Sequence, residues 1–409
     1  MAPGAEHGGG CGVQHSTSED LAHFKVGVRI ALMIYLDNNA TTRILPEVLE
    51  AMMPYLTSEW GNPSSSYNFG SRLKGPVEVA RAHVADLIGA HASEIIFTSC
   101  ATESNNAAVR AALKANPAKH HVITSTVEHS SVLNCCAAVE KEGYRVTYLP
   151  VDRNGLLSPS DLENAITSET GLVTLMWANN ETGVIFPVKE IAEICHSRGV
   201  LYHCDAVQAA GKLAINVDEI PVDYLSLTGH KFHAPKGIGT LYVRRKAPFS
   251  PLICGGHQER NRRAGTESIP LIVALGKAAE LARRNVDRYA HQVRPLRDEL
   301  EDHLLTGLPD VERNGDKTQR IANTSNISFG GIESEALLIL LDQEGVCASS
   351  GAACLADSTD PSHVITAMKP DSGASSHAIR FSLSEDTCAD DVRKTIMAVR
   401  ECVGILRGG

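Results

Sequence analysis

The sequence lacks several features that would place a chain of 409 residues in a specialised class. It has no excess of basic residues: 38 Lys and Arg stand against 48 Asp and Glu, a formal net charge of -10. The electrostatic footprint of a nucleic-acid-binding protein is therefore missing. It also has no apolar run of the roughly 20 residues that a membrane span needs, because Lys25 and Arg29 interrupt the stretch from Leu21 to Leu36. We expect neither nucleic acid nor a membrane as a partner.

The 11 cysteines form no regular framework. Their number is odd, they are scattered over a long chain, and no Cys-x-x-Cys pair occurs. Small secreted domains carry an even, dense set of cysteines, and structural zinc sites use paired thiols, so neither is expected. The N-terminus also lacks the basic region and the small-residue cleavage site of a signal peptide. These absences favour a protein of a reducing, cytoplasmic compartment.

What the chain does have is an ordinary globular composition, with 43% hydrophobic and 21% charged residues. Residues 1–32 differ from the rest, because glycines and polar residues dominate them, and they predict a flexible N-terminal extension. We place a large domain at 33–287 and a smaller C-terminal α/β domain at 288–409. The first residues after Met33 can pack on the smaller domain in this division.

Short apolar runs alternate with segments of helical periodicity between Met33 and about Ala210. The runs have strand length and are rich in β-branched residues. This alternation predicts βαβ units and a mostly parallel sheet, with functional residues in the loops after the carboxyl ends of the strands. A long helix is predicted over 278–308, and a second set of elements begins at Asn323. The predicted strands are 94–98, 121–124, 172–177, 201–204, 238–243, 327–329 and 378–383, and a further helix is predicted at 335–341.

Lys231 stands between a strand and a turn rich in Gly and Pro. It follows Thr228-Gly-His230, and Pro235-Lys-Gly237 precedes the next strand. A lysine whose pKa is lowered by its surroundings can form a Schiff base with an aldehyde cofactor. A lone loop lysine is more often a solvated side chain, so the assignment depends on the rest of the sequence.

Two other segments point to the same cofactor chemistry. Asp205 ends an apolar strand, where a half-buried carboxylate needs a charged or hydrogen-bonded partner. A protonated pyridine nitrogen is such a partner, and a cap for the next helix is the alternative. The segment from Phe97 to Asn106 is typical of a strand followed by small and hydroxyl residues that open a helix, which suits a phosphate. A plain helix cap is the alternative there too.

Eight short motifs occur in the order seen in cysteine desulfurases, which use pyridoxal 5'-phosphate (PLP). They are Asp37-Asn-Asn-Ala-Thr-Thr42, Gly61-Asn-Pro-Ser-Ser65, Ala101-Thr-Glu-Ser-Asn105, Glu128-His129, Ala178-Asn-Asn-Glu-Thr-Gly183, Asp205-Ala-Val-Gln208, Thr228-Gly-His-Lys231 and Arg263-Ala-Gly-Thr266. From about Met33 to its end the chain resembles this family, and it looks closest to the nitrogen-fixation (NifS-type) branch. The resemblance implies an α/β protein with the PLP-dependent aminotransferase-like fold (fold type I).

The resemblance also implies an activity and partners. The enzyme would convert L-cysteine to L-alanine and capture the sulfur as a persulfide on Cys354, within a run of small residues. The sulfur would pass to an iron–sulfur scaffold or another acceptor protein, in a nitrogenase-related role. Whether Cys354 also holds a cluster transiently is left open, and no other metal site is expected. A homodimer with shared active sites is implied.

The matching motifs imply a role for each site residue. Lys231 would hold PLP, Asp205 would pair with the pyridine nitrogen, and His129 would stack on the ring and help to move protons. Arg380 would bind the substrate carboxylate in a bidentate pair, a geometry that a guanidinium suits. Asn180 and Gln208 would hydrogen-bond the phenolic oxygen of PLP, and Asn180 would also contact the substrate. The phosphate would be bound by Ala101, Thr102, Thr228 and His230. Thr266 would contact the phosphate bound in the neighbouring subunit.

The chain departs from the family pattern at four places, all outside the PLP-binding motifs. Tyr67 stands where His is usual, Ser268 replaces a common Asn, Leu355 replaces a small or hydroxyl residue, and Glu385 stands where a basic residue often follows. Three readings other than a cysteine desulfurase stay open. They are a selenocysteine lyase, an aminotransferase of the same fold, and a non-enzymatic assembly scaffold.

Overall fold

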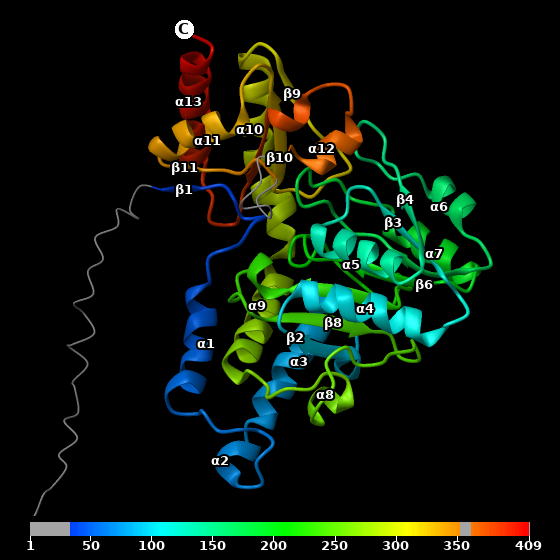
Figure 1. Cartoon of the computed structure of the whole chain (residues 1–409). Coiled ribbons are helices and arrows are strands. Elements are labelled where there is room, and N and C mark those ends of the chain that lie inside the picture. The colour runs from blue at the N-terminus through cyan, green and yellow to red at the C-terminus, as the bar shows by residue number, and fades with distance from the viewer. Residues whose placement is uncertain (1–32, 352–360, 409) are drawn as a thin grey trace, which may run out of the picture. The chain divides into compact units, whose positions relative to one another are not determined.

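The structure, a computed structural model, describes residues 33–351 and 361–408 (Figure 1). The predicted extension 1–32 and Cys354 lie outside the described residues. In chain order the elements are β1 (Ile34–Tyr35), α1 (Pro46–Thr57), α2 (Asn68–Ser71), α3 (Lys74–Ile88), β2 (Ile95–Thr98), α4 (Ala101–Ala115), β3 (His121–Ser125), α5 (Ser130–Lys141), β4 (Arg145–Leu149), α6 (Pro159–Ala165), β5 (Thr170–Thr174), α7 (Val188–Ser197), β6 (Leu201–Asp205), β7 (Tyr224–Thr228), β8 (Gly239–Val243), α8 (Gln258–Asn261), α9 (Ile269–Arg288), α10 (Arg294–Gly307), β9 (Val311–Arg313), β10 (Thr324–Phe329), α11 (Ser334–Gln343), β11 (Val346–Cys347), α12 (His363–Met368), β12 (Ala378–Ser382) and α13 (Ala389–Leu406).

The largest sheet has seven strands in the order β2-β8-β7-β6-β5-β3-β4. The strands from β7 to β4 pair in parallel, whereas β8 pairs antiparallel with both β7 and β2. Because β8 is reversed between two strands of the same direction, the other six strands end at one edge of the sheet. The prediction of a mostly parallel sheet is confirmed, and the loops that follow these strands gather at that edge.

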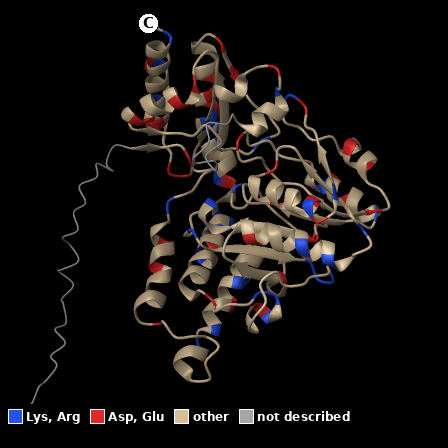
Figure 2. Cartoon of the chain, viewed as in Figure 1, with Lys and Arg blue, Asp and Glu red and all other residues tan. Residues whose placement is uncertain are grey.

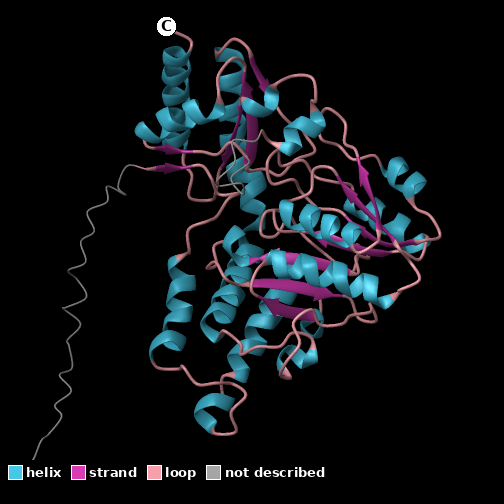
Figure 3. Cartoon of the chain, viewed as in Figure 1, coloured by secondary structure: helices cyan, strands magenta, loops and turns pink. Residues whose placement is uncertain are grey.

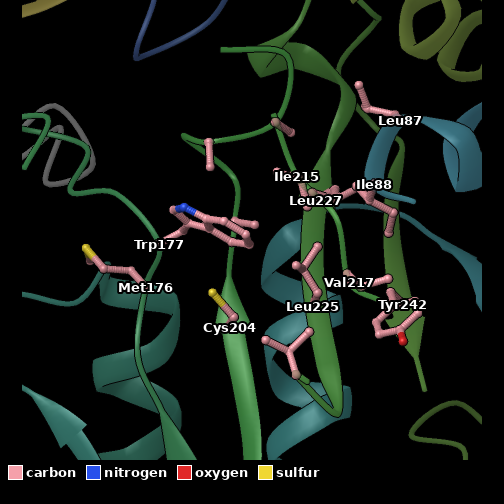
Figure 4. Packing of buried hydrophobic residues seen from close by; sticks show 14 of the residues in the cluster. Leu87, Ile88, Met176, Trp177, Cys204, Ile215, Val217, Leu225, Leu227 and Tyr242 are labelled. Atoms are coloured by element: carbon pink, nitrogen blue, oxygen red, sulfur yellow. The ribbon is translucent and has the colours of Figure 1, made fainter. Parts of the chain in front are cut away.

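Helices cover both faces of this sheet (Figure 3). Side chains alternate along each strand, so Leu225 and Leu227 of β7 pack with α3, α7 and α9, whereas Tyr224 packs with α4 and α5. Figure 4 shows Leu225 and Leu227 among the buried side chains of the first cluster, near Cys204 and Val217. Burial on both faces explains why the strands are near-continuous apolar runs in the sequence.

The C-terminal part contains an antiparallel sheet in the order β12-β10-β9 and a separate core formed with α10, α11 and α13. The beginning of the described chain joins it, because Ile34 and Tyr35 of β1 pair in parallel with Val346 and Cys347 of β11. The side chain of Leu36 is fully buried in the same core. The segment after β1 then leads to the seven-stranded sheet and passes the edge where the strands end.

Several predicted bounds differ by a few residues from those observed, and two predicted elements differ more. The strand predicted over 172–177 ends at Thr174, where the chain turns into the loop that approaches the cavity described below. The single helix predicted over 278–308 is interrupted by a π-helical turn, Tyr289–Val293, between α9 and α10. Pro295 explains the interruption, because it has no N–H for the hydrogen bond of a continuous α-helix.

Charge and hydropathy do not single out a membrane segment. No helix in the described part of the chain is long and apolar enough to cross a membrane. Acidic and basic residues are interspersed along the helices in Figure 2.

Candidate active site

A cavity of about 300 Å³ lies at the edge where the six strands end, within the size range of small-molecule sites. Loops that follow β2, β3, β5, β6 and β7 all contribute to it. It is lined by Asn39, Ala40, Cys100, Ala101, Thr102, His129, Ser131, Met176, Ala178, Asn180, Asp205, Val207, Gln208, Thr228, His230, Lys231, Gly351 and Arg380. Most of the predicted site residues therefore meet in one place.

An amine and a carboxylate line this cavity from neighbouring strands. Lys231 ends a 3₁₀ turn after β7, and its Nζ donates to the backbone carbonyls of Asn39 at 2.6 Å and Ala40 at 2.7 Å. Asp205 ends β6 and is 7% exposed. Its carboxylate accepts hydrogen bonds from Asn105 Nδ2 at 2.8 Å and from the backbone N–H of Val207 at 3.0 Å. These bonds fix the orientation of the carboxylate.

The amino end of α4 supplies an anion site. Cys100 precedes the helix in an extended conformation, and its side chain does not cap the first turn, so the N–H groups of Ala101 and Thr102 can face an anion. β8 passes close behind this turn: a Cβ on Gly239 would lie 2.7 Å from the backbone carbonyl carbon of Cys100. Only glycine fits at that position.

Thr228 and His230 border the same cavity from the end of β7. Burial lowers the pKa of His230 to about 4, and the charges of Lys231 and Lys236 act in the same direction. His230 is therefore neutral at pH 7 and keeps one ring N–H as a donor.

A hydrogen-bonded chain joins His129 to Asp205. His129 caps α5, and its Nδ1 accepts the backbone N–H of Ser131 at 3.1 Å. The Ser131 hydroxyl lies 2.8 Å from the same Nδ1 and 2.9 Å from Asn105 Nδ2, and Asn105 in turn donates to Asp205. Because Nδ1 accepts, the neutral imidazole carries its proton on Nε2.

Arg380 reaches the cavity from β12. It is 2% exposed, its Nη2 lies 2.6 Å from Asp37 Oδ1, and its Nη1 donates to the carbonyl of Asn180 at 3.0 Å. Its Nε is buried and has no partner among the described residues. The carbonyl of Asn180 also accepts from Asn39 Nδ2 at 3.2 Å, so three distant segments meet at this wall.

The donor set fits PLP. The cavity combines an amine that can bind an aldehyde, a carboxylate that can hold a protonated ring nitrogen, and an uncapped helix start that can hold a phosphate. A metal site has no such support, because the described residues contain no cluster of three His, Cys, Asp or Glu side chains placed to hold an ion.

Two predicted site residues are not part of this cavity as described. Thr266 is exposed and is not among the lining residues. Cys354 lies outside the described residues, although Gly351, just before the gap, borders the cavity. Cys135 and Cys136 give no rival, because both are buried on α5 and burial raises the pKa of Cys136 to about 12.

Sequence reasoning gave no role to Asn39, Ala40, Ser131 or Lys212. Asn39 and Ala40 belong to the motif Asp37–Thr42, so a signal was present without an assignment. Ser131 follows the Glu128-His129 motif directly. Lys212 is almost fully buried and donates to Gln208, and no pattern in its vicinity indicates this contact.

Comparison with known proteins agrees with this geometry. The sequence profile described as Aminotransferase class-V matches residues 34–395, so the chain belongs to the class-V aminotransferase family. PLP is the cofactor of this family. Its curated relatives are named as cysteine desulfurases: that of Trichormus azollae is 53% identical over 375 residues, covering 92% of this chain and 94% of the relative. Cysteine desulfurase NifS of Azotobacter vinelandii is 46% identical over 375 residues, covering 91% and 93%.

Solved structures give the same picture. A NifS-like protein superposes with a TM-score of 0.86 at 35% identity, covering 91% of this chain and 100% of that one. A structure described as SspA in complex with cysteine superposes with a TM-score of 0.75 at 36% identity, covering 85% and 98%. The predicted fold type is therefore confirmed.

Proposed function

We propose that this chain is a PLP-dependent cysteine desulfurase that converts L-cysteine to L-alanine and captures the sulfur on Cys354. The observation that carries the proposal is the convergence of Lys231, Asp205 and the start of α4 on one cavity. The relatives that share half of its sequence carry the same name, cysteine desulfurase. An assembly scaffold without catalysis would have no need of this donor set.

The residues of the cavity have separate roles in binding and in proton transfer. When bound, PLP supplies an electron sink for negative charge that develops at the substrate's α carbon. Lys231 would hold the cofactor through its aldehyde, and Asp205 would hold the proton of the ring nitrogen. His129, held by Ser131, presents Nε2 as the proton-carrying atom. Arg380 binds the substrate carboxylate through guanidinium N–H groups, of which Nε has no partner in the described part of the chain.

Sulfur transfer requires a nucleophile as well. The thiolate of Cys354 attacks the substrate sulfur, so an S–S bond forms while the substrate's Cβ–S bond breaks. The electron pair of the broken bond takes up a proton at Cβ and gives L-alanine. L-cysteine and a thiol thus become L-alanine and a persulfide, without an external oxidant. A reductant or an acceptor protein is needed only to unload the persulfide.

The proposal includes a homodimer in which Thr266 completes the phosphate site of the partner. Two observations support it: Thr266 is exposed outside its own cavity, and α1 carries an exposed apolar stripe. Leu49, Met53 and Leu56 are 48%, 42% and 53% exposed, and Trp60 after the helix is 70% exposed. Exposed apolar surface of this extent is typical of protein interfaces.

The proposed acceptor is an iron–sulfur scaffold in the cytoplasm, in a nitrogenase-related role. The likeness to NifS of Azotobacter vinelandii supports this direction.

A product assay with a variant tests the reaction. The parent protein with PLP, L-cysteine and a reductant should release sulfide and alanine in equal amounts. Cys354→Ala should retain the visible absorbance of the cofactor and still respond to L-cysteine, but both products should fall together. An aminotransferase would tolerate this substitution.

Mass spectrometry locates the sulfur. Without a reductant, one extra sulfur atom should appear on the peptide that contains Cys354. Cys100, which lines the cavity, and Cys347 provide the internal controls. Extra sulfur on either of them, and none on Cys354, would remove Cys354 from the mechanism.

A further inference from the structure

Lys212 is a buried cation that the proposed reaction leaves without a role. It follows the turn after β6 and is 4% exposed. Its Nζ donates to Oε1 of Gln208 at 2.8 Å, and no carboxylate among the described residues pairs with it. Burying an ammonium group beside a single neutral acceptor costs free energy. An apolar side chain would therefore serve a purely structural role at this position better than a lysine.

The ionisable neighbours of Lys212 are cations or imidazoles. Burial, together with the charges of Lys231 and Arg380, lowers the pKa of Lys212 to about 7. His230 and His233 lie near enough for Lys212 to lower the pKa of each in turn. The neighbourhood thus holds an excess of positive charge, as expected beside a site for an anionic cofactor.

Gln208 connects Lys212 to the cavity. Gln208 lines the cavity, and its Nε2 donates to the carbonyl of Asn39 at 3.0 Å. The same carbonyl accepts Lys231 Nζ at 2.6 Å. Lys212, Gln208 and Asn39 therefore form one hydrogen-bonded chain that ends at the proposed cofactor lysine.

The carbonyl of Asn39 can only accept and the Nζ of Lys212 donates, so these two neighbours fix the orientation of the carboxamide. Oε1 of Gln208 must face Lys212, so the NH₂ group faces Asn39 and the cavity. One of its hydrogens bonds to the carbonyl of Asn39, and the second remains for a ligand. With the opposite orientation, Oε1 would face the carbonyl oxygen of Asn39, acceptor to acceptor, and the hydrogen bond from Nζ of Lys212 to Oε1 would be lost.

We propose that Lys212 is a positioning residue: it fixes the Gln208 carboxamide so that its N–H donates to the ring oxygen of PLP. This proposal rests on the proposed function, since it concerns the same cofactor. A donor at that oxygen stabilises its negative charge. Loss of the donor therefore raises the pH at which the cofactor's visible absorbance changes in the substrate-free enzyme.

Lys212→Met keeps the length of the side chain and removes its donors. In the purified holoenzyme without substrate, the pH midpoint of the visible absorbance should rise by about one unit. Gln208→Leu should produce the same rise, and Lys212→Met should add nothing in the Gln208→Leu background. Rises that add, or no rise in Lys212→Met, overturn the proposal.

Lys369→Met is the matched control, because Lys369 is also buried, at 9% exposure, and bonds to Asn314 outside the cavity. Its midpoint should equal that of the parent. If Lys212→Met fails to fold, Lys212→Arg tests the same point, because it keeps a donor-only group and should keep the parent midpoint. A midpoint displaced as far as in Gln208→Leu then overturns the proposal. A protein that binds no PLP at all would instead contradict the proposed function.

Discussion

Asp37 and Arg380 form an ion pair at the wall of the cavity, with 2.6 Å between Oδ1 and Nη2, although 343 positions separate them in the chain. Their side chains are 18% and 3% exposed. The pair joins the segment after β1 to the centre of β12. The same guanidinium donates from Nη1 to the carbonyl of Asn180, so Arg380 also joins β12 to the loop that follows β5.

Removing one partner should leave a buried charge without compensation. Asp37→Ala and Arg380→Ala should each lower the free energy of unfolding by about 3–5 kcal/mol. The double variant should lose clearly less than the sum, because neither charge is then left unpaired. Denaturant unfolding of the four proteins measures this coupling. Additive losses would show that the two charges act independently.

Asp205→Asn should separate cofactor binding from catalysis. The amide keeps the size of the side chain but cannot stabilise a proton on the ring nitrogen, so kcat should fall roughly 100-fold or more while PLP stays bound. Asp223→Asn is the matched control. Asp223 is a partly buried carboxylate that accepts the backbone N–H of Tyr202 at the opposite ends of the strands. Equal kcat in Asp205→Asn and in the parent would exclude Asp205 from the chemistry.

The turn that precedes Thr266 stores backbone strain. Glu259, Arg260 and Asn261 have φ of 48°, 58° and 65°, which costs non-glycine residues roughly 1–2 kcal/mol each. Glu259 keeps the turn in place, because both carboxylate oxygens bond to the buried guanidinium of Arg81, at 2.6 and 2.8 Å.

Arg260→Gly and Arg260→Ala both remove the surface ion pair with Glu78. The difference between their free energies of unfolding therefore measures the backbone strain at this position. The glycine variant should be the more stable by about 1 kcal/mol. Thermal unfolding at equal PLP saturation measures the difference. Equal stability would mean that the turn relaxes without cost.

His203 should make the fold sensitive to acid. It is fully buried, with Thr174 Oγ1 at 2.8 Å and Ser226 Oγ at 2.9 Å, and burial lowers its pKa to about 4 from an ordinary value of 6.5. Between these two values the unfolded chain binds a proton that the folded chain does not. Stability should therefore be lost as the pH falls from 6.5 toward 4, by about 3 kcal/mol from this residue. His203→Gln should show a shallower decline in urea unfolding, and an unchanged slope would contradict this origin.

The sheet was largely predictable because burial on both faces produces apolar runs of strand length. β4 escaped prediction for the converse reason. It is the edge strand, it begins with an exposed Arg145, and its next three residues are only partly buried, so no apolar run marks it. The reversal of β8 leaves no trace in the pattern either, since a buried strand has the same composition in both directions.

The candidate site was predictable where residues follow strand ends, as Asp205 and Lys231 do. The contributions of Asp37 and Asn39 depend on pairings with residues far along the chain, which no local pattern encodes. Lys212 shows a further limit. The sequence does not distinguish a buried lysine from a solvated one. Only the folded structure shows that Lys212 is buried and bonded to Gln208.

The contact between Asn38 and the carbonyl of Ser382 spans 344 positions, and it has a consequence for the order of events during synthesis. A ribosome adds about 5–20 residues per second, so roughly 15 seconds to a minute pass between the two ends of this contact. During that time the seven-stranded sheet can form while one wall of its cavity does not yet exist. The nascent chain thus carries Lys231 and Asp205 before Arg380 is made. Binding of the substrate carboxylate is therefore an event of the nearly finished polypeptide, and translation that stalls before Arg380 leaves the cavity without the guanidinium of that wall.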